Sequence, residues 1–337
     1  MKEGVLLINL GTPSAPTASS VGRYLRQFLN DRRVIDIHPL ARFFLVNAII
    51  IPFRRFRSAA LYRKIWTPEG SPLMIHSLAL KEKLQQALGN KYLVDLAMRY
   101  QQPSIQKALD HLRTQHVSKI HILPLYPQYA SSSTGSSIEE VLRMLRSWEV
   151  IPSLHIVSKF YDQAAYREAI LKQASKYVLK DYDHVLFSYH GLPERQIIKA
   201  SAHYGGNSCN LGHCCDSIHE KNQFCYRANC MATSRFLAGA LGLPEEQYSS
   251  AFQSRLDNKW LKPYSDKVLS DLARSGKKKV LVFSPAFVAD CLETTYEIAE
   301  EYNELFRKHG GEKVTLVESL NSDDAWVMAL RSMIVTA

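Results

Sequence analysis

The sequence has no apolar run long enough to cross a membrane, and it has no recognisable leader. Its longest apolar stretch, residues 43–53, covers about half of the roughly 20 residues that a membrane-spanning helix needs. Residues 1–11 contain too few apolar side chains and no small-residue cleavage site for a signal peptide. Low-complexity tracts and linkers are missing as well. We therefore expect a folded protein of the cytoplasm.

Cysteine is scarce outside one segment, and no two cysteines have the C-x-x-C spacing of a zinc ribbon. Five of the six lie within residues 209–230, which indicates a local metal or redox site and not a disulfide framework. Two C-x4-C spans with an adjacent pair suit the wide bite of a two-iron cluster. Zinc, with His213 or His219 as a ligand, and free or redox-paired thiols stay open. One of the five is surplus to a four-ligand site: Cys209, Cys214, Cys215, Cys225 and Cys230.

Acidic residues are outnumbered, with 32 Asp and Glu against 42 Lys and Arg, so the formal net charge is +10. Such a surface favours nucleic acid, anionic lipid, or a small molecule with carboxylates or phosphates. We exclude nucleic acid because the basic residues lack the interleaved aromatic side chains that stack on bases. Arg42, Arg54, Arg55 and Arg57 bracket the apolar residues 43–53. That segment is either a buried helix or an apolar lip that touches a membrane surface.

Short apolar runs alternate with amphipathic helical patterns along the 337 residues, a length typical of two domains. The runs predict strands that helices cover on both faces, and therefore an α/β architecture with parallel sheets. Two similar strand ends, "VLLINLGTP" and "VLFSYHGLP", indicate two similar halves with a boundary near residues 148–155. The predicted strands are residues 4–11, 92–100, 119–127, 184–191 and 278–287, and the predicted helices include 104–115, 137–148 and 164–179.

A histidine stands at the end of the predicted strand 184–191, the end at which ligands bind in α/β folds. Imidazole can accept a proton near neutral pH or ligate a metal. Gly191 behind it lets a ligand or another backbone approach closely. His190 is therefore either a functional group of this kind or a core histidine bonded to a backbone carbonyl.

An acidic stripe follows the predicted strand 278–287. Residues that recur at intervals of three and four share one helix face, and a cation would relieve the repulsion between their charges. A solvated helix face is the alternative for the outer glutamates, whereas Glu293 lies one turn from the strand end and could face one cleft with His190. The stripe consists of Asp290, Glu293, Glu297, Glu300 or Glu301, and Glu304.

Five segments together resemble the ferrochelatase family, in order and along nearly the whole chain. They read LLINLGTP, EGSPLMIHS, LYPQYASSSTGSS, LFSYHGLPER and FVADCLETTYEI. The resemblance implies two similar Rossmann-like, chelatase-type domains, each a parallel sheet flanked by helices, with the active cleft between them. The expected parts are residues 1–150 with the apolar lip, residues 151–318 with the cysteine segment, and a C-terminal helix in 319–337 that packs back on the first domain.

The same resemblance implies a lyase that inserts Fe²⁺ into protoporphyrin IX, releases two protons and completes haem biosynthesis. The apolar segment 43–53 favours protoporphyrin, whose vinyl edge is less polar than the extra propionates of coproporphyrin. The alternatives are a coproporphyrin or cobalt chelatase, and a non-enzymatic iron–sulfur sensor or haem carrier on the same fold. We expect a monomer or homodimer without a nucleic-acid partner, cytoplasmic or peripherally attached to a membrane.

Residue roles follow from the resemblance as expectations. His190 and Glu293 become the catalytic pair, and both, together with Glu297, are expected to meet the ferrous iron. Which of the two takes up pyrrole protons and which delivers the metal stays open. The expected porphyrin contacts are Arg54, Arg55, Tyr62, Ser71, Arg99, Tyr129, Trp260 and Phe287.

Two departures from the family concern metals. Many relatives have histidine at the position of Cys291, and mitochondrial members hold a [2Fe–2S] cluster with cysteines mainly in a C-terminal extension. This chain has Ser131 in the matching internal segment and no cysteine after residue 291. The resemblance to bacterial relatives with internal cysteines therefore implies a [2Fe–2S] cluster with a structural or regulatory role. Its expected ligands are Cys209, Cys215, Cys225 and Cys230, with Cys214 as the alternative.

Overall fold

Each half of the chain is built on its own parallel sheet in the computed structural model, which describes residues 1–336. One unit comprises residues 1–126 and 131–158 together with the chain from Asn321 onwards. The other unit comprises residues 127–130 and 159–320. The predicted architecture of two parallel sheets flanked by helices is confirmed.

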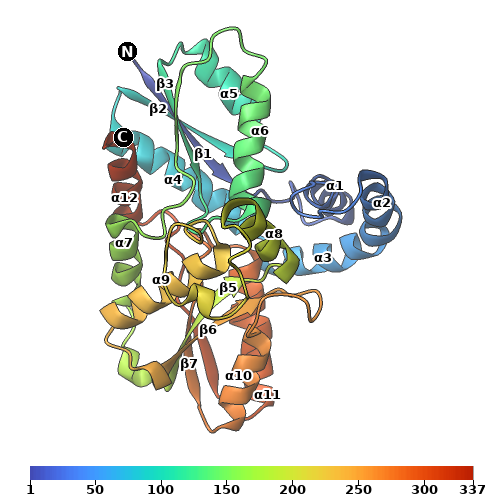
Figure 1. The fold of residues 1–337 in the computed structure, drawn as a ribbon, viewed down its shortest axis with the longest axis vertical. Helices are drawn as coiled ribbons and strands as arrows, with labels where there is room; N and C mark the ends of the chain where they lie inside the picture. Colours follow the sequence, from blue (N-terminus) through green and yellow to red (C-terminus); the bar gives the residue numbers. More distant parts are fainter. Residues whose placement is uncertain (337) are drawn as a thin grey trace. The chain divides into compact units, whose positions relative to one another are not determined.

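The sheet of the first unit has four parallel strands in the order β2-β1-β3-β4, of which Figure 1 labels β1, β2 and β3. Strand β1 runs from Glu3, paired with Tyr92, to Asn9, paired with Met98, so β1 and β2 end at the same edge. The central strands are almost wholly buried because helices cover the sheet. The strands are β1 (Glu3–Asn9), β2 (Tyr92–Met98), β3 (Lys119–Pro124) and β4 (Ser153–Ile156).

Helices α5 and α6 lie beside these strands (Figure 1) and bury their apolar faces against one side of the sheet. Leu109 and Leu112 of α5 and Val141 of α6 belong to one core with Leu6 and Ile122. The helices of the unit are α1 (Ala18–Leu29), α2 (Pro39–Phe44), α3 (Ile51–Ile65), α4 (Pro72–Leu88), α5 (Ile105–Thr114), α6 (Ser136–Leu145) and α12 (Asp324–Val335), with π-helical segments η1 (Leu45–Ile50) and η2 (Ser131–Gly135).

The last helix, α12, packs on α4 within the first unit. Arg331 Nε donates to the backbone carbonyl of Ala87 at 3.1 Å, and Lys83 forms an ion pair with Asp324 at 2.8 Å. Trp326 on α12 is completely buried. These contacts attach the final helix to the first sheet's unit although it follows the second unit in the sequence.

The second unit repeats the strand order of the first, as β6-β5-β7-β8, of which Figure 1 labels β5, β6 and β7. Its core joins apolar residues of β5, β6 and β7 to helix α10 and to the segment from Ile298 to Phe306. The strands are β5 (His184–His190), β6 (Tyr248–Gln253), β7 (Lys279–Phe283) and β8 (Lys313–Leu316). The helices are α7 (Ala164–Ala174), α8 (Glu194–Tyr204), α9 (Tyr226–Ala240), α10 (Ser265–Arg274) and α11 (Asn303–Lys308), with 3₁₀ turns η3 (Leu179–Asp181), η4 (His213–Cys215) and η5 (Glu245–Gln247).

The predicted acidic helix after β7 is a π-helix, η6 (Leu292–Tyr302), that continues into α11. Its hydrogen bonds join residues five apart, so its faces do not follow the three- and four-residue intervals of an α-helix. The acidic residues therefore do not form the single continuous stripe that the α-helical period predicts. Glu293 and Glu297 are half-buried, while Glu300, Glu301 and Glu304 are exposed.

Candidate active site

Strand β5 carries His190 at the edge where the strand ends. Residues 184–189 are buried, and His190 is the first residue of the strand to be partly exposed. The chain then turns at Gly191, whose amide donates to the carbonyl of Gln253 at 2.8 Å. A Cβ on Gly191 would lie 2.7 Å from that same oxygen, so the close approach of the two backbones requires glycine.

The imidazole of His190 has one nitrogen engaged and one free. Nδ1 lies 2.6 Å from the carbonyl oxygen of Gly191. Because a carbonyl only accepts, Nδ1 carries the hydrogen and Nε2 keeps its lone pair. Nε2 has no hydrogen-bond partner within residues 1–336. The ring can therefore accept a proton or ligate a metal through Nε2.

Aromatic side chains flank this imidazole. The ring centroid of Trp260 lies 6.5 Å from that of His190, and the centroid of Phe287 lies 6.3 Å away. Both aromatic side chains are partly exposed, as the expected role in porphyrin contact requires. The structure thus brings three of the residues singled out in the sequence to one place.

Glu293 lies in the first turn of η6. That helix begins after Cys291, whose amide donates to Thr294 Oγ1 at 3.0 Å, so the start of the helix is capped. The backbone carbonyl of Glu293 accepts from Gln253 Nε2 at 3.0 Å. Since the backbone carbonyl of Gln253 also accepts from the Gly191 amide, one residue connects the segments that carry His190 and Glu293. The carboxylate of Glu297, in contrast, already accepts hydrogen bonds from protein groups.

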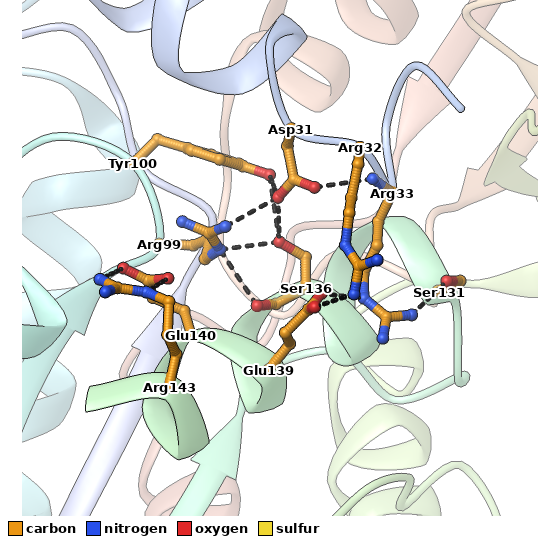
Figure 2. A network of polar contacts seen from close by, with 10 residues as sticks. All are labelled: Asp31, Arg32, Arg33, Arg99, Tyr100, Ser131, Ser136, Glu139, Glu140 and Arg143. Carbon is orange, nitrogen blue, oxygen red and sulfur yellow. Dashed lines mark hydrogen bonds and ion pairs between the residues drawn. The ribbon is translucent and has the colours of Figure 1, made fainter. Parts of the chain in front are cut away.

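In the first unit, Arg99 belongs to a polar network that Figure 2 shows. Its Nη2 forms an ion pair with Asp31 at 2.8 Å, and its Nε donates to Ser136 Oγ at 2.7 Å. The hydroxyl of Tyr100 also donates to Asp31, at 2.8 Å. Burial alone would raise the pKa of Asp31, but the hydrogen bonds from Ser136, the Arg33 amide and Tyr100 and the charge of Arg99 lower it. The charge of Arg99 is therefore already neutralised within its own unit.

The neighbouring arginines of this network also pair with carboxylates, although Arg32 and Arg33 share one (Figure 2). Arg32 and Arg33 both pair with Glu139, and Arg143 pairs with Glu140 at 2.9 Å. Helix α3 differs: within residues 1–336, no ion pair joins its Arg54, Arg55 or Arg57 to a carboxylate.

The remaining predicted porphyrin contacts differ in exposure. Tyr62 is buried and packs edge-on against Trp66, and Ser71 is buried as the cap of α4. Arg54 is exposed, whereas Arg55 is half-buried and stacks its guanidinium on Phe56. In the second unit, the ring of Tyr129 packs edge-on against Phe224 at 5.5 Å.

The apolar segment at 43–53 is not a buried helix. It runs from α2 through η1 into α3, three segments that Figure 1 shows together on one side of the first unit's strands. Phe53 is 76 % exposed. The other exposed apolar side chains of this surface are Leu40, Phe43, Phe44, Ile49 and Phe56. No helix within residues 1–336 is long and apolar enough to cross a membrane.

The clustered cysteines are all free thiols, and four of them contact one another. The Sγ atoms of Cys214 and Cys215 lie 3.9 Å apart, Cys209 is hydrogen-bonded to Cys214, and Cys215 is hydrogen-bonded to Cys225. The contact with Cys215 lowers the pKa of Cys225, while the same contact and burial raise the pKa of Cys215. Cys230 is completely buried and hydrogen-bonded to Tyr226.

These contacts are pairwise and do not converge on one point. Within residues 1–336, no group of three or more His, Cys, Asp or Glu side chains is arranged to hold a metal ion. Outside this segment, the thiol of Cys291 is buried and hydrogen-bonded to Glu293, and both effects raise its pKa. Cys291 is thus a neighbour of Glu293 in its protonated form.

Reasoning from the sequence missed Gln253 and Asp31. Neither stands in a motif that signals chemistry, and each becomes important through partners far away in the sequence. A polar residue at the end of a strand was the only available signal for Gln253.

The sequence matches the family described as Ferrochelatase over residues 2–337. The chain belongs to the ferrochelatase family. Among its ferrochelatase relatives, that of Legionella pneumophila (strain Lens) is 46 % identical over 335 residues, which cover 99 % of each chain. The ferrochelatase of Coxiella burnetii (strain CbuK_Q154) is 43 % identical and covers 98 % of this chain and 93 % of its own. The fold is similar to that of the sirohydrochlorin chelatase SirB from Bacillus subtilis subspecies spizizenii, with a TM-score of 0.56 at 12 % identity over 99 % of this chain and 94 % of that one.

Proposed function

We propose that this ferrochelatase inserts ferrous iron into protoporphyrin IX, the terminal step of haem biosynthesis, and that His190 is its base. The free Nε2 of His190, beside two aromatic rings and tied through Gln253 to Glu293, is the observation that carries the assignment. Metallation removes two pyrrole protons, and a base near neutral pKa suits that task. Ferrous iron enters as a substrate.

One imidazole lone pair accepts one proton at a time. We assign the first pyrrole proton to Nε2 of His190, because the bond from Nδ1 to Gly191 fixes the tautomer that can take it. We assign to the carboxylate of Glu293, on the segment that Gln253 joins to the end of β5, the stabilisation of the resulting imidazolium or the contact with the cation. After the imidazolium releases its proton to solvent, the second pyrrole proton can follow the same route.

The test is an anaerobic metallation assay with matched substrates. We expect Fe²⁺ and protoporphyrin IX to give protohaem, with lower kcat/KM for coproporphyrin and for Co²⁺ in place of iron. A chain that binds porphyrin without metallating it would instead support the haem-carrier alternative. Faster turnover of coproporphyrin would identify a coproporphyrin chelatase.

The arginines of α3 are the candidates for the porphyrin propionates. Arg54 is exposed and has no carboxylate partner, whereas Arg99 is neutralised by Asp31. Arg54→Gln is therefore expected to raise the KM for protoporphyrin, while Arg99→Gln lowers stability. A porphyrin with esterified propionates provides the control, since its KM should not respond to Arg54→Gln.

For the cysteine segment we propose a [2Fe–2S] cluster held by Cys209, Cys214, Cys215 and Cys225. The four thiols contact one another, whereas Cys230 faces Tyr226 in the core, so the alternative with Cys214 is favoured. Because the contacts are pairwise, binding requires a local adjustment of the segment. A bound cluster would be structural or regulatory, since metallation leaves the oxidation state of the iron unchanged.

Iron and labile-sulfide analysis of anaerobically purified protein tests this cluster. We expect thiolate–iron absorption bands, their loss in Cys214→Ser, and their retention in Cys230→Ser. Stoichiometric zinc without sulfide would contradict the proposal, as would equal loss in both variants.

We propose that the exposed apolar surface of α2, η1 and α3 contacts an anionic membrane. Its phenylalanines can enter the headgroup region while the unpaired Arg54 and Arg57 meet lipid phosphates. Co-sedimentation with vesicles of phosphatidylcholine and phosphatidylglycerol should therefore decrease in Phe53→Ser. Leu142→Ser, on the exposed side of α6, should leave it unchanged. Equal binding of both variants would contradict the contact.

A further inference from the structure

The carboxylate of Glu297 is surrounded by hydrogen-bond donors from its own unit. Oε1 accepts from the Ser254 amide and from the Tyr302 hydroxyl, each at 2.8 Å. Oε2 accepts from the Ser254 hydroxyl and from Gln253 Nε2, which lies 3.2 Å away. A carboxylate offers about four lone-pair directions, so these donors occupy the group. Glu297 therefore holds the end of β6 in place, and an incoming cation would have to displace protein donors.

Gln253, the last residue of β6, is buried and has both polar side-chain atoms paired. Its Oε1 accepts from the Ser188 hydroxyl at 2.8 Å. Its Nε2 donates to the backbone carbonyl of Glu293 at 3.0 Å and to the carboxylate of Glu297. Its own carbonyl accepts from the Gly191 amide at 2.8 Å. One residue thus joins the end of β5 to the first turn of η6.

His190 lies between Ser188 and Gly191, the two residues that Gln253 holds, and it is paired with Gln253 in the parallel ladder. The carbonyl of Gly191, whose amide Gln253 fixes, accepts from His190 Nδ1. A movement of Gln253 would therefore change both the position of the imidazole and the hydrogen bond that sets its tautomer.

We infer that Gln253 is a positioning residue, which holds His190 and Glu293 relative to each other, and that Glu297 orients its amide. The inference rests on the proposed role of that pair in metallation. Nε2 faces two acceptors and Oε1 faces a hydroxyl, so only one orientation of the amide satisfies all partners. A glutamate at this position would keep the shape but place a carboxylate oxygen against the Glu293 carbonyl and the Glu297 carboxylate.

The test compares Gln253→Glu, the double variant Gln253→Glu/Glu297→Gln, and Gln173→Glu as a matched control. Gln173 is buried in the same unit and donates Nε2 to the Ser319 carbonyl at 2.8 Å. We expect Gln253→Glu to lower kcat about 100-fold, because small displacements of a catalytic group have effects of this size. Its KM for protoporphyrin should stay within about threefold.

The double variant returns an N–H donor from residue 297 to residue 253, so we expect it to recover about tenfold in kcat over Gln253→Glu. Gln173→Glu should lower the melting temperature and leave kcat within about twofold of the parent. If Gln253→Glu does not fold, Gln253→Asn replaces it, since the shorter amide cannot reach the Glu293 carbonyl. The same loss of kcat is expected there.

A second readout is independent of turnover. The ¹⁵N chemical shifts of the imidazole, assigned with His190→Ala, report which nitrogen carries the hydrogen. We expect the Nδ1–H form in the parent and in Gln173→Glu, and a mixture of both forms in Gln253→Glu. Unchanged shifts together with unchanged kcat in Gln253→Glu would overturn the inference, and so would an equal loss of kcat in Gln173→Glu. A parent without metallation activity would refute the proposed function, while the shifts would still decide on Gln253.

Discussion

In both units, a glycine follows the first central strand of the sheet and lies close to the chain at the end of the neighbouring strand. After β1 ends at Asn9, a Cβ on Gly11 would lie 2.0 Å from the carbonyl oxygen of Tyr100. After β5 ends at His190, a Cβ on Gly191 would lie 2.7 Å from the carbonyl oxygen of Gln253. The close approach of the two backbones is common to both units, but the residue at the strand end is Asn9 in the first unit and His190 in the second.

The loops that these glycines touch are alike as well. At the end of β2, the Met98 amide donates to the carbonyl of Pro103 in the following loop, at 2.7 Å. At the end of β6, the Phe252 amide donates to the carbonyl of Pro263 in the following loop, at 2.8 Å. Both prolines follow a cis peptide bond. The similarity therefore extends from the strand order into the loops that follow β2 and β6.

The two units anchor these loops with different chemistry. Asp31 in the first unit holds its loop through an ion pair with Arg99, whereas Glu297 in the second receives only uncharged donors from Gln253, Ser254 and Tyr302. At the strand ends, Asn9 donates to Ser77 and accepts from the next amide, while Nε2 of His190 has no partner within residues 1–336. The side chain at the end of β1 therefore has its hydrogen bonds made within the first unit. The side chain at the end of β5 keeps a nitrogen lone pair without a partner within residues 1–336.

Replacing the strand-end residues should give the largest difference between the units. His190→Ala removes the proposed base, and we expect the metallation rate to fall by about 10²- to 10⁴-fold. Asn9→Ala removes the hydrogen bond to Ser77 and should lower the free energy of unfolding by about 1–2 kcal/mol. Haem formation under anaerobic conditions and urea unfolding of both variants provide the measurements. If His190→Ala metallates at the parent's rate, the ends of β1 and β5 do not differ in chemical role.

The sequence predicts much of the second unit's edge, because the signal there is local. The run from Val185 to Tyr189 is almost continuously apolar and ends in His190 and Gly191, so a buried strand that ends in a titratable residue could be predicted. The strands β4, β6 and β8 could not be recognised, because they are short or polar and lie at the edges of their sheets. A strand such as Ser153–Ile156 has no apolar run to mark it.

Contacts between distant segments explain the other differences. The π-helical form of η6 cannot be read from a spacing of three and four, which an α-helix uses as well. Asp31 and Gln253 acquire their importance from Arg99 and Glu293, which are distant in the sequence. Local pattern therefore predicts which side chains are chemically capable, and the folded structure decides which of them are already occupied.

The two glycines should separate stability from activity. Gly11 has φ +113° and would direct a methyl group into the Tyr100 carbonyl, so Gly11→Ala should lower the free energy of unfolding by about 3 kcal/mol. Gly191→Ala meets the Gln253 carbonyl at a longer distance and should destabilise by about 1–2 kcal/mol. Its metallation rate should nevertheless fall by about tenfold or more, because the backbone beside His190 moves. Calorimetry and the metallation assay test the pair; equal stability of the two variants would contradict the structural difference.

Removing the charge of Asp31, which pairs with Arg99 in the first unit, should have a smaller effect on the free energy of unfolding. Asp31 and Arg99 form a mostly buried pair, with side chains 5 % and 18 % exposed, so Asp31→Asn should destabilise by about 2 kcal/mol. Asp324→Asn is the matched control, because its partner Lys83 and its own carboxylate are exposed, and a loss below about 0.5 kcal/mol is expected. Urea unfolding of both variants decides the point. Similar midpoints would mean that the network of Figure 2 contributes no more than a surface pair.

An effect of comparable size is expected in acid, because each unit has a histidine buried in a central strand. Burial, and then the charge of Lys277, lowers the pKa of His184 in β5 to about 4, while its Nε2 lies 2.6 Å from Ser249 Oγ. Burial also lowers the pKa of His121 in β3, but its hydrogen bond with Glu3 opposes that shift. The histidine without a carboxylate partner should therefore dominate the response.

The direction of the effect follows from proton uptake. The unfolded chain protonates residue 184 near its ordinary pKa of 6.5 and the folded chain only near 4, so stability should fall as the pH decreases through this interval. The contribution of His184 is on the order of 2 kcal/mol. Urea unfolding at pH 7.5 and pH 5 should show a smaller loss for His184→Gln than for the parent, and His121→Gln should reduce the loss less. If His184→Gln and the parent lose stability in parallel, His184 is not the group that makes the second unit sensitive to acid.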